Sequence, residues 1–206
     1  MPASSPAVPK NWPRDVVFLR KFHIPPPLSA SALQVQIHEA GAYPVITPAP
    51  AIPSPLVRIT PITLPSHPAC GQSGLFAAKA LPPDSFVLFY LGHVHDSFTT
   101  DTTSNYDLNL DRQLDLSVDA TQFGNEARFI NDYRGVRGEG PNAEFRDCVA
   151  PIGLGLGERR IGVFVLSAGR ARKNDKGTTR ARGIKKGDEI VVSYGKGFWD
   201  ARKGRT

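Results

Sequence analysis

The chain of 206 residues has a formal net charge of +6 at pH 7, 40% hydrophobic residues and two cysteines. No run of about 18 apolar residues occurs, which excludes a membrane-spanning helix, and the N-terminus lacks the basic-then-apolar order of a secretory signal. The low cysteine count excludes a disulfide framework and a cysteine-rich zinc cluster, while the basic balance allows an acidic partner such as nucleic acid.

Residues 1–66 are rich in proline, which stops helices and interrupts the ladders of β-sheets. Residues 12–24 mix large apolar and basic side chains, and residues 29–40 could form a short helix. We predict an extended, partly ordered arm over a folded domain. A plain linker is favoured over a proline-rich ligand for another protein.

From about Val57 the sequence changes to short runs that are rich in β-branched and aromatic residues and bounded by Gly, Pro, Asp and Asn. No long helical periodicity separates these runs, so a parallel sheet of βαβ units is not expected. The predicted fold class is mostly β, with short strands and substantial loops. The predicted strands are 56–60, 74–78, 85–90, 106–110, 114–118, 160–165 and 189–194.

Two glycine-rich segments do not fit nucleotide-binding motifs. Gly71–Gly74 precedes a strand and lacks the third glycine of the dinucleotide fingerprint. Gly153–Gly157 is not followed by the Lys-Ser/Thr of a phosphate loop, so it predicts a hairpin turn. His93 and His95 could share one face of a strand, but no cysteine or carboxylate cluster completes a ligand set, and no metal is expected.

The segment 118–133 is the most distinctive part of the chain. Its centre, Gly124-Asn125 followed by Arg128-Phe129-Ile130-Asn131, neither alternates like a strand nor repeats like an amphipathic helix. Tight polar turns of this kind are often shaped around a ligand or another chain segment. Taken alone, the pattern favours a buried turn whose Asn and Arg side chains satisfy nearby carbonyl groups.

Further motifs lie on both sides of this segment. They are 72–77 (Gln-Ser-Gly-Leu-Phe-Ala), 90–92 (Tyr-Leu-Gly), 106–108 (Tyr-Asp-Leu), 141–142 (Pro-Asn), 184–190 (Ile-Lys-Lys-Gly-Asp-Glu-Ile) and 194–195 (Tyr-Gly). Their order and spacing resemble those of the SET-domain lysine methyltransferases, over about Cys70 to Trp199. Gln72 takes the place of the first glycine in the family's opening Gly-x-Gly turn.

The resemblance implies a SET-domain β-clip: short strands in several small sheets, few short helices and a pseudoknot near the C-terminus. Together with the proline-rich composition of the N-terminal segment, it divides the chain into an N-terminal arm over residues 1–66, a SET domain over 67–199 and a basic C-terminal tail over 200–206. No cysteine-rich segment flanks the domain. The arm and the tail would therefore close the substrate channel in place of zinc-binding segments.

The resemblance also implies the chemistry, which is in-line transfer of a methyl group from S-adenosylmethionine to a lysine amine. The amine must be neutral, whereas free lysine is protonated near pH 7. A dry channel ending beside a positive sulfonium lowers the lysine pKa through desolvation and like-charge repulsion. No strong base is then needed, and the main task of the protein is alignment.

By the same resemblance, Tyr194 is the catalytic residue, with its hydroxyl directed at the methyl-transfer site. Tyr106, Val192 and Tyr194 line the lysine channel, and Val192 replaces the Phe or Tyr that governs the number of methyl groups in many members. Trp199 would pack over the adenine of the cofactor, and a hydrophobic plug that closes the C-terminus is its alternative role. The predicted cofactor-binding residues are Ser73, Gly74, Leu75, Arg128, Phe129, Asn131, Asp132 and Trp199.

The central segment departs from the family pattern in two ways. The usual Asn-His pair is Asn131-Asp132, and the Ser and Cys that normally follow are replaced by Tyr133 and an insertion, 134–140. A carboxylate at position 132 alters the electric field around a bound sulfonium. It could strengthen or misplace cofactor binding.

We therefore predict an S-adenosylmethionine-dependent protein-lysine methyltransferase that acts on a histone or another protein, in the nucleus or alternatively the cytoplasm. The alternative is an inactive SET-like scaffold that binds protein or chromatin, suggested by Asp132, although retention of Tyr194 favours the enzyme. A basic nucleic-acid-binding β-domain lacks the aromatic and basic strand signature of single-strand binders.

Two charged features bear on partners. The basic loop 170–186 could contact nucleosomal DNA through its phosphates, or be a solvated loop. Acidic residues could attract a basic histone tail. These residues are Asp107, Asp111, Asp115 and Asp119.

Overall fold

Short strands make up most of the regular structure in the computed structural model, which describes residues 8–168 and 183–200. Helical structure in these ranges is limited to the 3-10 turns η1 (Ala30–Leu33), η2 (Ile37–Glu39) and η3 (Glu126–Phe129) and to α1 (Gly195–Asp200). None of these helices has the length and hydrophobicity that a membrane crossing requires. The strands are β1 (Val17–Phe18), β2 (Gln34–Gln36), β3 (Val57–Pro61), β4 (Ser73–Ala77), β5 (Phe86–Tyr90), β6 (His93–His95), β7 (Asp107–Asp111), β8 (Leu116–Asp119), β9 (Phe123–Gly124), β10 (Asn131–Asp132), β11 (Ala143–Gly153), β12 (Leu156–Val165) and β13 (Val191–Val192).

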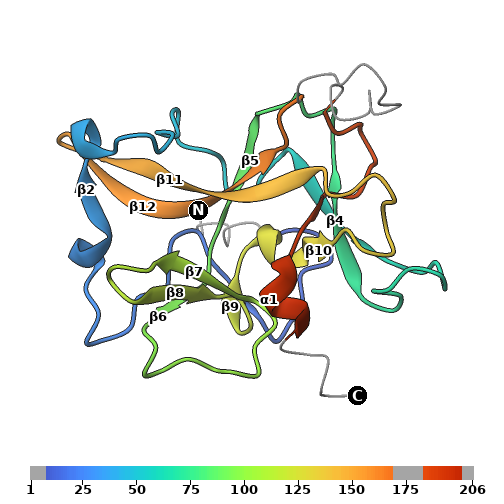
Figure 1. Ribbon diagram of the computed structural model, residues 1–206, viewed down its shortest axis with the longest axis horizontal. Coiled ribbons are helices and arrows are strands. Elements are labelled where there is room, and N and C mark those ends of the chain that lie inside the picture. Colours follow the sequence, from blue (N-terminus) through green and yellow to red (C-terminus); the bar gives the residue numbers. More distant parts are fainter. Residues whose placement is uncertain (1–7, 169–182, 201–206) are drawn as a thin grey trace, which may run out of the picture.

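A long antiparallel hairpin, β11–β12, runs across the molecule (Figure 1). Its turn contains Gly153, Leu154 and Gly155, all with positive φ (101°, 53° and 75°). Glycine adopts this conformation without steric cost, which explains the hairpin turn predicted here. The other edge of β12 pairs with β2 near the turn and with β5 further along, so that distant parts of the chain join one sheet.

Smaller sheets pack beside this hairpin. In the described residues, β6, β8 and β7 form a three-stranded sheet, and three strand pairs are β3–β4, β1–β9 and β10–β13. Because a two-stranded ribbon cannot bury a core alone, these sheets pack around one shared core. The mostly-β fold of several small sheets with few helices is therefore confirmed. Fully buried side chains include Leu75, Leu91, Val118, Val163 and Ile190.

The segment before residue 67 takes part in several of these sheets. β1 lies beside β9, β2 beside β12 and β3 beside β4. The short helix considered for residues 29–40 is replaced by η1, β2 and η2, because residues 34–36 pair with the edge of β12. The division of the chain into an arm, a domain and a tail stays a prediction.

Near the C-terminus, β10 and β13 pair in parallel, with Asn131 opposite Val191 and Asp132 opposite Val192. This pairing is called the crossing below, because it joins two segments that are distant in the sequence. The N–H of Tyr133 donates to the carbonyl of Val192 at 2.9 Å and extends the pairing. Two segments that are far apart in the sequence therefore lie side by side, as the expected pseudoknot requires.

The buried side chain of Asn125 joins the distinctive central segment to the core. Its Oδ1 accepts the N–H of Leu91 at 3.1 Å, and its Nδ2 donates to the carbonyl of Phe89 at 2.8 Å. These backbone groups lie at and just beyond the end of β5. The asparagine thus satisfies main-chain groups inside the core, as the pattern of this segment predicted.

Candidate active site

Two neighbouring cavities lie beside the crossing of β10 and β13. Cavity A has a volume of about 520 Å³, and its wall includes Asn131, Asp132 and Trp199. Cavity B has a volume of about 370 Å³ and lies next to β7 and the loop before it. The residues shared by both walls are Asn105, Tyr106, Arg128, Tyr194 and Phe198.

Tyr194 lies between the two cavities, just after β13. Its hydroxyl donates a hydrogen bond to the carbonyl of Ile130 at 2.8 Å, and its N–H donates to Asp132 Oδ2 at 2.8 Å. Burial raises the pKa of Tyr194 well above its ordinary value, and the neighbouring Tyr106 raises it further. The hydroxyl therefore stays protonated and can act as a hydrogen-bond donor.

Arg128 and Tyr106 also lie in the wall that the two cavities share, and these two residues together with Tyr194 are called the partition. The guanidinium of Arg128 lies over the Tyr106 ring, 4.5 Å from its centroid, and its Nε donates to the carbonyl of Ala120 at 2.9 Å. The carbonyl of Tyr106 in turn accepts the hydroxyl of the buried Tyr90 at 2.5 Å. A planar cation stacked on an aromatic face restricts the motion of both side chains.

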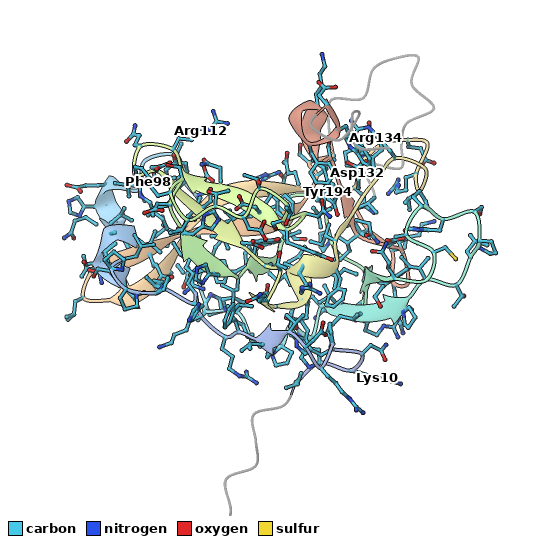
Figure 2. The ribbon with its side chains drawn as sticks, turned by 90° about the horizontal axis from the view of Figure 1, so that it is seen from below. Lys10, Phe98, Arg112, Asp132, Arg134 and Tyr194 are labelled. Atoms are coloured by element: carbon cyan, nitrogen blue, oxygen red, sulfur yellow. The ribbon has the colours of Figure 1, made fainter. Side chains whose placement is uncertain are left out.

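Asp132 is the centre of a polar network in the wall of cavity A. Its carboxylate pairs with the guanidinium of Arg134 at 2.8 Å and accepts the indole N–H of Trp199 at 3.3 Å. Burial acts to raise the pKa of Asp132, but hydrogen bonds from the backbone N–H groups of Tyr194 and Arg134 and from the side chains of Trp199 and Arg134 together leave this pKa lowered. Figure 2 shows Asp132, Arg134 and Tyr194 gathered beside α1.

The two departures from the family pattern are physically connected. Arg134, the first residue of the insertion 134–140, pairs with the carboxylate that replaces the usual histidine. The guanidinium offsets the charge of Asp132 within cavity A. This pairing reduces the change in electric field that the sequence suggested for a lone carboxylate.

Most of the predicted site residues lie together. Tyr106 and Tyr194 are in the walls of both cavities, whereas Val192 is 1% exposed and its side chain belongs to the core. The predicted cofactor-binding residues in the wall of cavity A are Ser73, Arg128, Phe129, Asn131, Asp132 and Trp199.

Gly74 and Leu75 lie in β4, behind the wall of cavity A, and Leu75 is fully buried. A Cβ atom at Gly74 would meet Oε1 of Glu189 at 2.6 Å and the ring of Phe76 at 3.0 Å. The requirement for glycine at this position therefore comes from a neighbouring side chain within the protein.

The sequence assigned no role to His67, which lies in the wall of cavity A, or to Glu189, which contacts His67 and Asn131 from behind this wall. Oε1 of Glu189 accepts the Nδ2–H of Asn131 at 2.8 Å, and Oε2 lies 3.0 Å from Nε2 of His67. Glu189 belongs to the closing motif 184–190, which was a signal for its position. A single histidine in a proline-rich segment carries no such signal.

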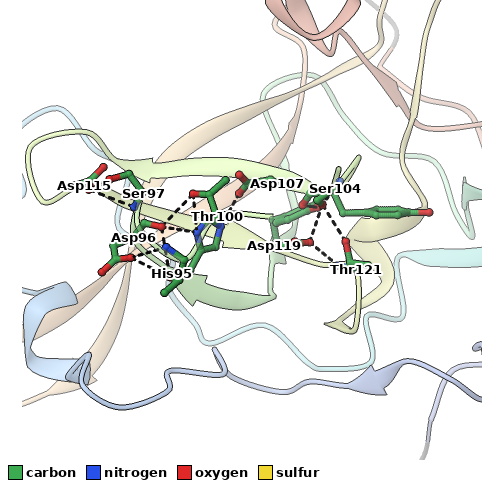
Figure 3. Close-up of polar contacts among 12 residues, drawn as sticks. His95, Asp96, Ser97, Thr100, Ser104, Asp107, Asp115, Asp119 and Thr121 are labelled. Atoms are coloured by element: carbon green, nitrogen blue, oxygen red, sulfur yellow. Dashed lines mark hydrogen bonds and ion pairs between the residues drawn. The ribbon is translucent and has the colours of Figure 1, made fainter. Parts of the chain in front are cut away.

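One side of cavity B is formed by the loop after β6, which His95 holds in place (Figure 3). The imidazole Nε2 is 3.0 Å from Asp107 Oδ1, and Nδ1 is 3.0 Å from the carbonyl of Asp96. Because both partners are acceptors, the two bonds coexist only when both ring nitrogens are protonated. Burial acts to lower the pKa of His95, but the bonds to Asp96 and Asp107 outweigh it and raise this pKa.

Of the acidic residues and the basic loop that could bind partners, the structure describes only the acidic residues in full. The four acidic residues all have partners within the chain, and of the four only Asp107 lines cavity A or cavity B. Most of the basic loop 170–186 lies outside the described residues. The acidic residues and their partners are Asp107 with His95, Asp111 with Arg159, Asp115 with Ser97, and Asp119 with Ser104.

No family model matches the chain. Histone-lysine N-methyltransferase ASHH3 of Arabidopsis thaliana is 28% identical over 61% of this chain, which spans 30% of the length of that protein. The resemblance to SET-domain methyltransferases that the motifs predicted is confirmed.

Solved structures are also similar to the chain. A crystal structure of the polycomb repressive complex 2 of Chaetomium thermophilum has a TM-score of 0.47 and 24% identity, over 72% of this chain and 16% of that chain. A structure of ctPRC2 in an autoinhibited conformation bound to S-adenosylmethionine has a TM-score of 0.48 and 23% identity, with the same two coverages of 72% and 16%.

The network around Asp132 predicts a pH-dependent stability. Above the ordinary aspartate pKa of about 3.9, wild type should exceed Asp132→Asn by about 1.5–3 kcal/mol in unfolding free energy, because the variant loses charge-assisted hydrogen bonds. The difference should disappear as the pH falls through the lowered pKa of the folded state. Urea unfolding over a pH series measures this difference in unfolding free energy, and Asp15→Asn, at an exposed aspartate, is the control. If both variants lost the same unfolding free energy, the stabilising network around Asp132 would be contradicted.

The imidazolium of His95 predicts the opposite pH dependence. The stability margin of wild type over His95→Gln should be fully present below the ordinary histidine pKa of about 6.5 and should be lost as the pH rises through the raised pKa of the folded state. Thermal unfolding on both sides of this range provides the measurement, and the exposed His38→Gln is the matched control. A margin that grows with pH would refute the charged form.

Proposed function

We propose that the chain is an S-adenosylmethionine-dependent protein-lysine N-methyltransferase that acts on a histone or another protein. The observation that carries this proposal is that Tyr106, Arg128 and Tyr194 form a wall shared by cavities A and B. Such a partition suits a reaction in which donor and acceptor enter from different sides and meet at one point. The similarity to a histone-lysine methyltransferase supports the same reaction.

The residues of cavity A suit S-adenosylmethionine. Its volume of about 520 Å³ lies within the usual range for ligand pockets, about 300–1,000 Å³. Trp199 and Phe198 offer aromatic surfaces for a purine, and Asn131 offers an amide to the amino acid end. When bound, this cofactor supplies the methyl group as an electrophilic sulfonium.

The residues of cavity B suit a lysine side chain. The aromatic rings of Tyr90, Tyr106 and Phe145 lie in its wall and would surround an aliphatic stem. Their exclusion of water favours a neutral amine, because desolvation lowers the pKa of lysine. The protonated hydroxyl of Tyr194 lies where the two cavities meet. It would orient the reacting groups by hydrogen bonding, so that no additional base is required.

The alternative is an inactive SET-like module that binds protein or chromatin. The unusual Asp132 suggested it, but the ion pair with Arg134 gives this carboxylate a local role that is compatible with catalysis. We further propose a nuclear location, with the cytoplasm as alternative, and contact with nucleosomal DNA through residues 170–186. The chain spans 30% of the length of the histone-lysine methyltransferase that it matches, so its substrate is likewise our proposal.

We expect Tyr194→Phe to lower the rate of methyl transfer by about a hundredfold or more, because the variant lacks the hydroxyl oxygen that would orient the reacting groups where the two cavities meet. The ring and the cavity walls remain, so cofactor binding and the thermal midpoint should change little. Transfer of a labelled methyl group to histone substrates measures the rate. Tyr43→Phe, at a tyrosine that is 44% exposed, is the control. Full activity of Tyr194→Phe would remove Tyr194 from the mechanism.

Calorimetric titration with S-adenosylmethionine tests the cofactor directly and requires no known substrate. We expect saturable binding to wild type that is lost in Asn131→Ala and kept in Asn109→Ala, which changes an exposed asparagine of β7 outside both cavities. The same titration with nucleosomes present tests for a requirement for a partner. Folded wild-type protein that binds no cofactor in either titration would favour the scaffold.

A further inference from the structure

Glu189 lies directly behind cavity A and is fixed by its own backbone. It forms an isolated antiparallel bridge with Phe76, and its carbonyl accepts the Nδ2–H of Asn142 at 2.8 Å. Its side chain is 9% exposed, and it fills the space that a side chain at Gly74 would need. The carboxylate is therefore confined between the neighbours that its two oxygens contact.

One of these neighbours, His67, has a defined proton. Its Nδ1 accepts the N–H of Ala69 at 3.0 Å, so this nitrogen carries no hydrogen. The ring hydrogen is then on Nε2, which lies 3.0 Å from Oε2 of Glu189. His67 thus donates to the carboxylate and requires an acceptor at this position.

The other neighbour, Asn131, has its amide orientation set by the same carboxylate. An ionised carboxylate only accepts hydrogen bonds, so the Nδ2 end of Asn131 must face Oε1 of Glu189, at 2.8 Å. Oδ1 of Asn131 makes no hydrogen bond with the residues that the structure describes, and Asn131 lies in the wall of cavity A. The atom that this side chain can offer to a ligand is an acceptor oxygen.

We propose that Glu189, held by His67, is a positioning residue that makes cavity A selective for a ligand carrying an ammonium group beside Asn131. The inference rests on the proposed function, in which this group is the α-ammonium of S-adenosylmethionine. Glu189 acts through Asn131 and does not itself contact the ligand. Its carboxylate keeps the amide from turning its NH₂ end toward the ammonium, where two donors would face each other.

The hydrogen-bond directions predict the effect of Glu189→Gln. The N–H of His67 still requires an acceptor, so the oxygen of the new amide faces His67 and its NH₂ faces Asn131. Asn131 must then flip to accept from this NH₂, and it presents its own NH₂ to the ligand. The variant keeps the shape of the site and reverses the polarity of one atom at its wall.

A second substitution should restore the original polarity. In the double variant Asn131→Asp/Glu189→Gln, the negative charge moves from one residue to the other and the total charge of the pair is unchanged. The carboxylate at position 131 accepts from the new amide with one oxygen and offers the other to the ligand. Recovery in this variant would show that the preference depends on an acceptor at position 131.

The experiment is a calorimetric titration of wild type and both variants with two ligands. One is S-adenosylhomocysteine, and the other is its analogue with hydrogen in place of the α-ammonium group. We expect wild type to prefer the ammonium ligand by about tenfold to a hundredfold, the usual value of a hydrogen bond to a charged group. Glu189→Gln should bind the two ligands about equally, and the double variant should recover the preference.

Each contrary result has a distinct meaning. A wild-type preference retained in Glu189→Gln overturns the inference, as does equal weakening of both ligands without recovery in the double variant. Equal affinity of wild type for the two ligands overturns it while leaving the proposed function intact. Wild type that binds neither ligand overturns the proposed function and the inference with it. Thermal unfolding verifies that each variant is folded. If Glu189→Gln does not fold but the double variant does, the ligand preference of the double variant tests the inference, and the absence of a preference there overturns it.

Discussion

The parallel crossing of β10 and β13 is the constraint on which the rest of the site depends. It is a short pairing of Asn131–Asp132 with Val191–Val192, too small to be stable by itself. In the part of the chain that the structure describes, no third strand joins this pair, and polar side chains complete it. Oδ1 of the buried Asn142 accepts the N–H of Val191 at 2.9 Å, and Asp132 Oδ2 accepts the N–H of Tyr194 at 2.8 Å.

The pairing of β10 with β13 also explains why polar side chains gather at one side of cavity A. It brings the side chains of Asn131 and Asp132 from one segment against Glu189 and Tyr194 from the other. Buried carboxylates are costly unless hydrogen-bonded, and both carboxylates here have several donors. The resulting network fixes the direction of each polar group. A ligand therefore meets a preorganised surface and does not have to order it on binding.

The partition of Tyr106, Arg128 and Tyr194 depends on the same arrangement. η3 carries Arg128, the loop before β7 carries Tyr106, and the turn after β13 carries Tyr194. These elements meet because the central segment is held to β5 by Asn125 and to the last strand by its own backbone. As a result, cavities A and B share one wall, which three separate parts of the chain build.

The sequence by itself determined the fold class, the hairpin turn at Gly153–Gly155 and the polar role of the central segment, because these depend on local propensity and on motif spacing. It also identified residues that line cavity A, such as Asn131 and Trp199. Only the tertiary structure decided that Arg134 pairs with Asp132, that His67 and Glu189 set the amide of Asn131, and that residues 29–40 join β12 as a strand with 3-10 turns. Each of these contacts depends on the register in which separate segments meet. A linear pattern of residue types carries no information about which side chain lies opposite another across such a crossing.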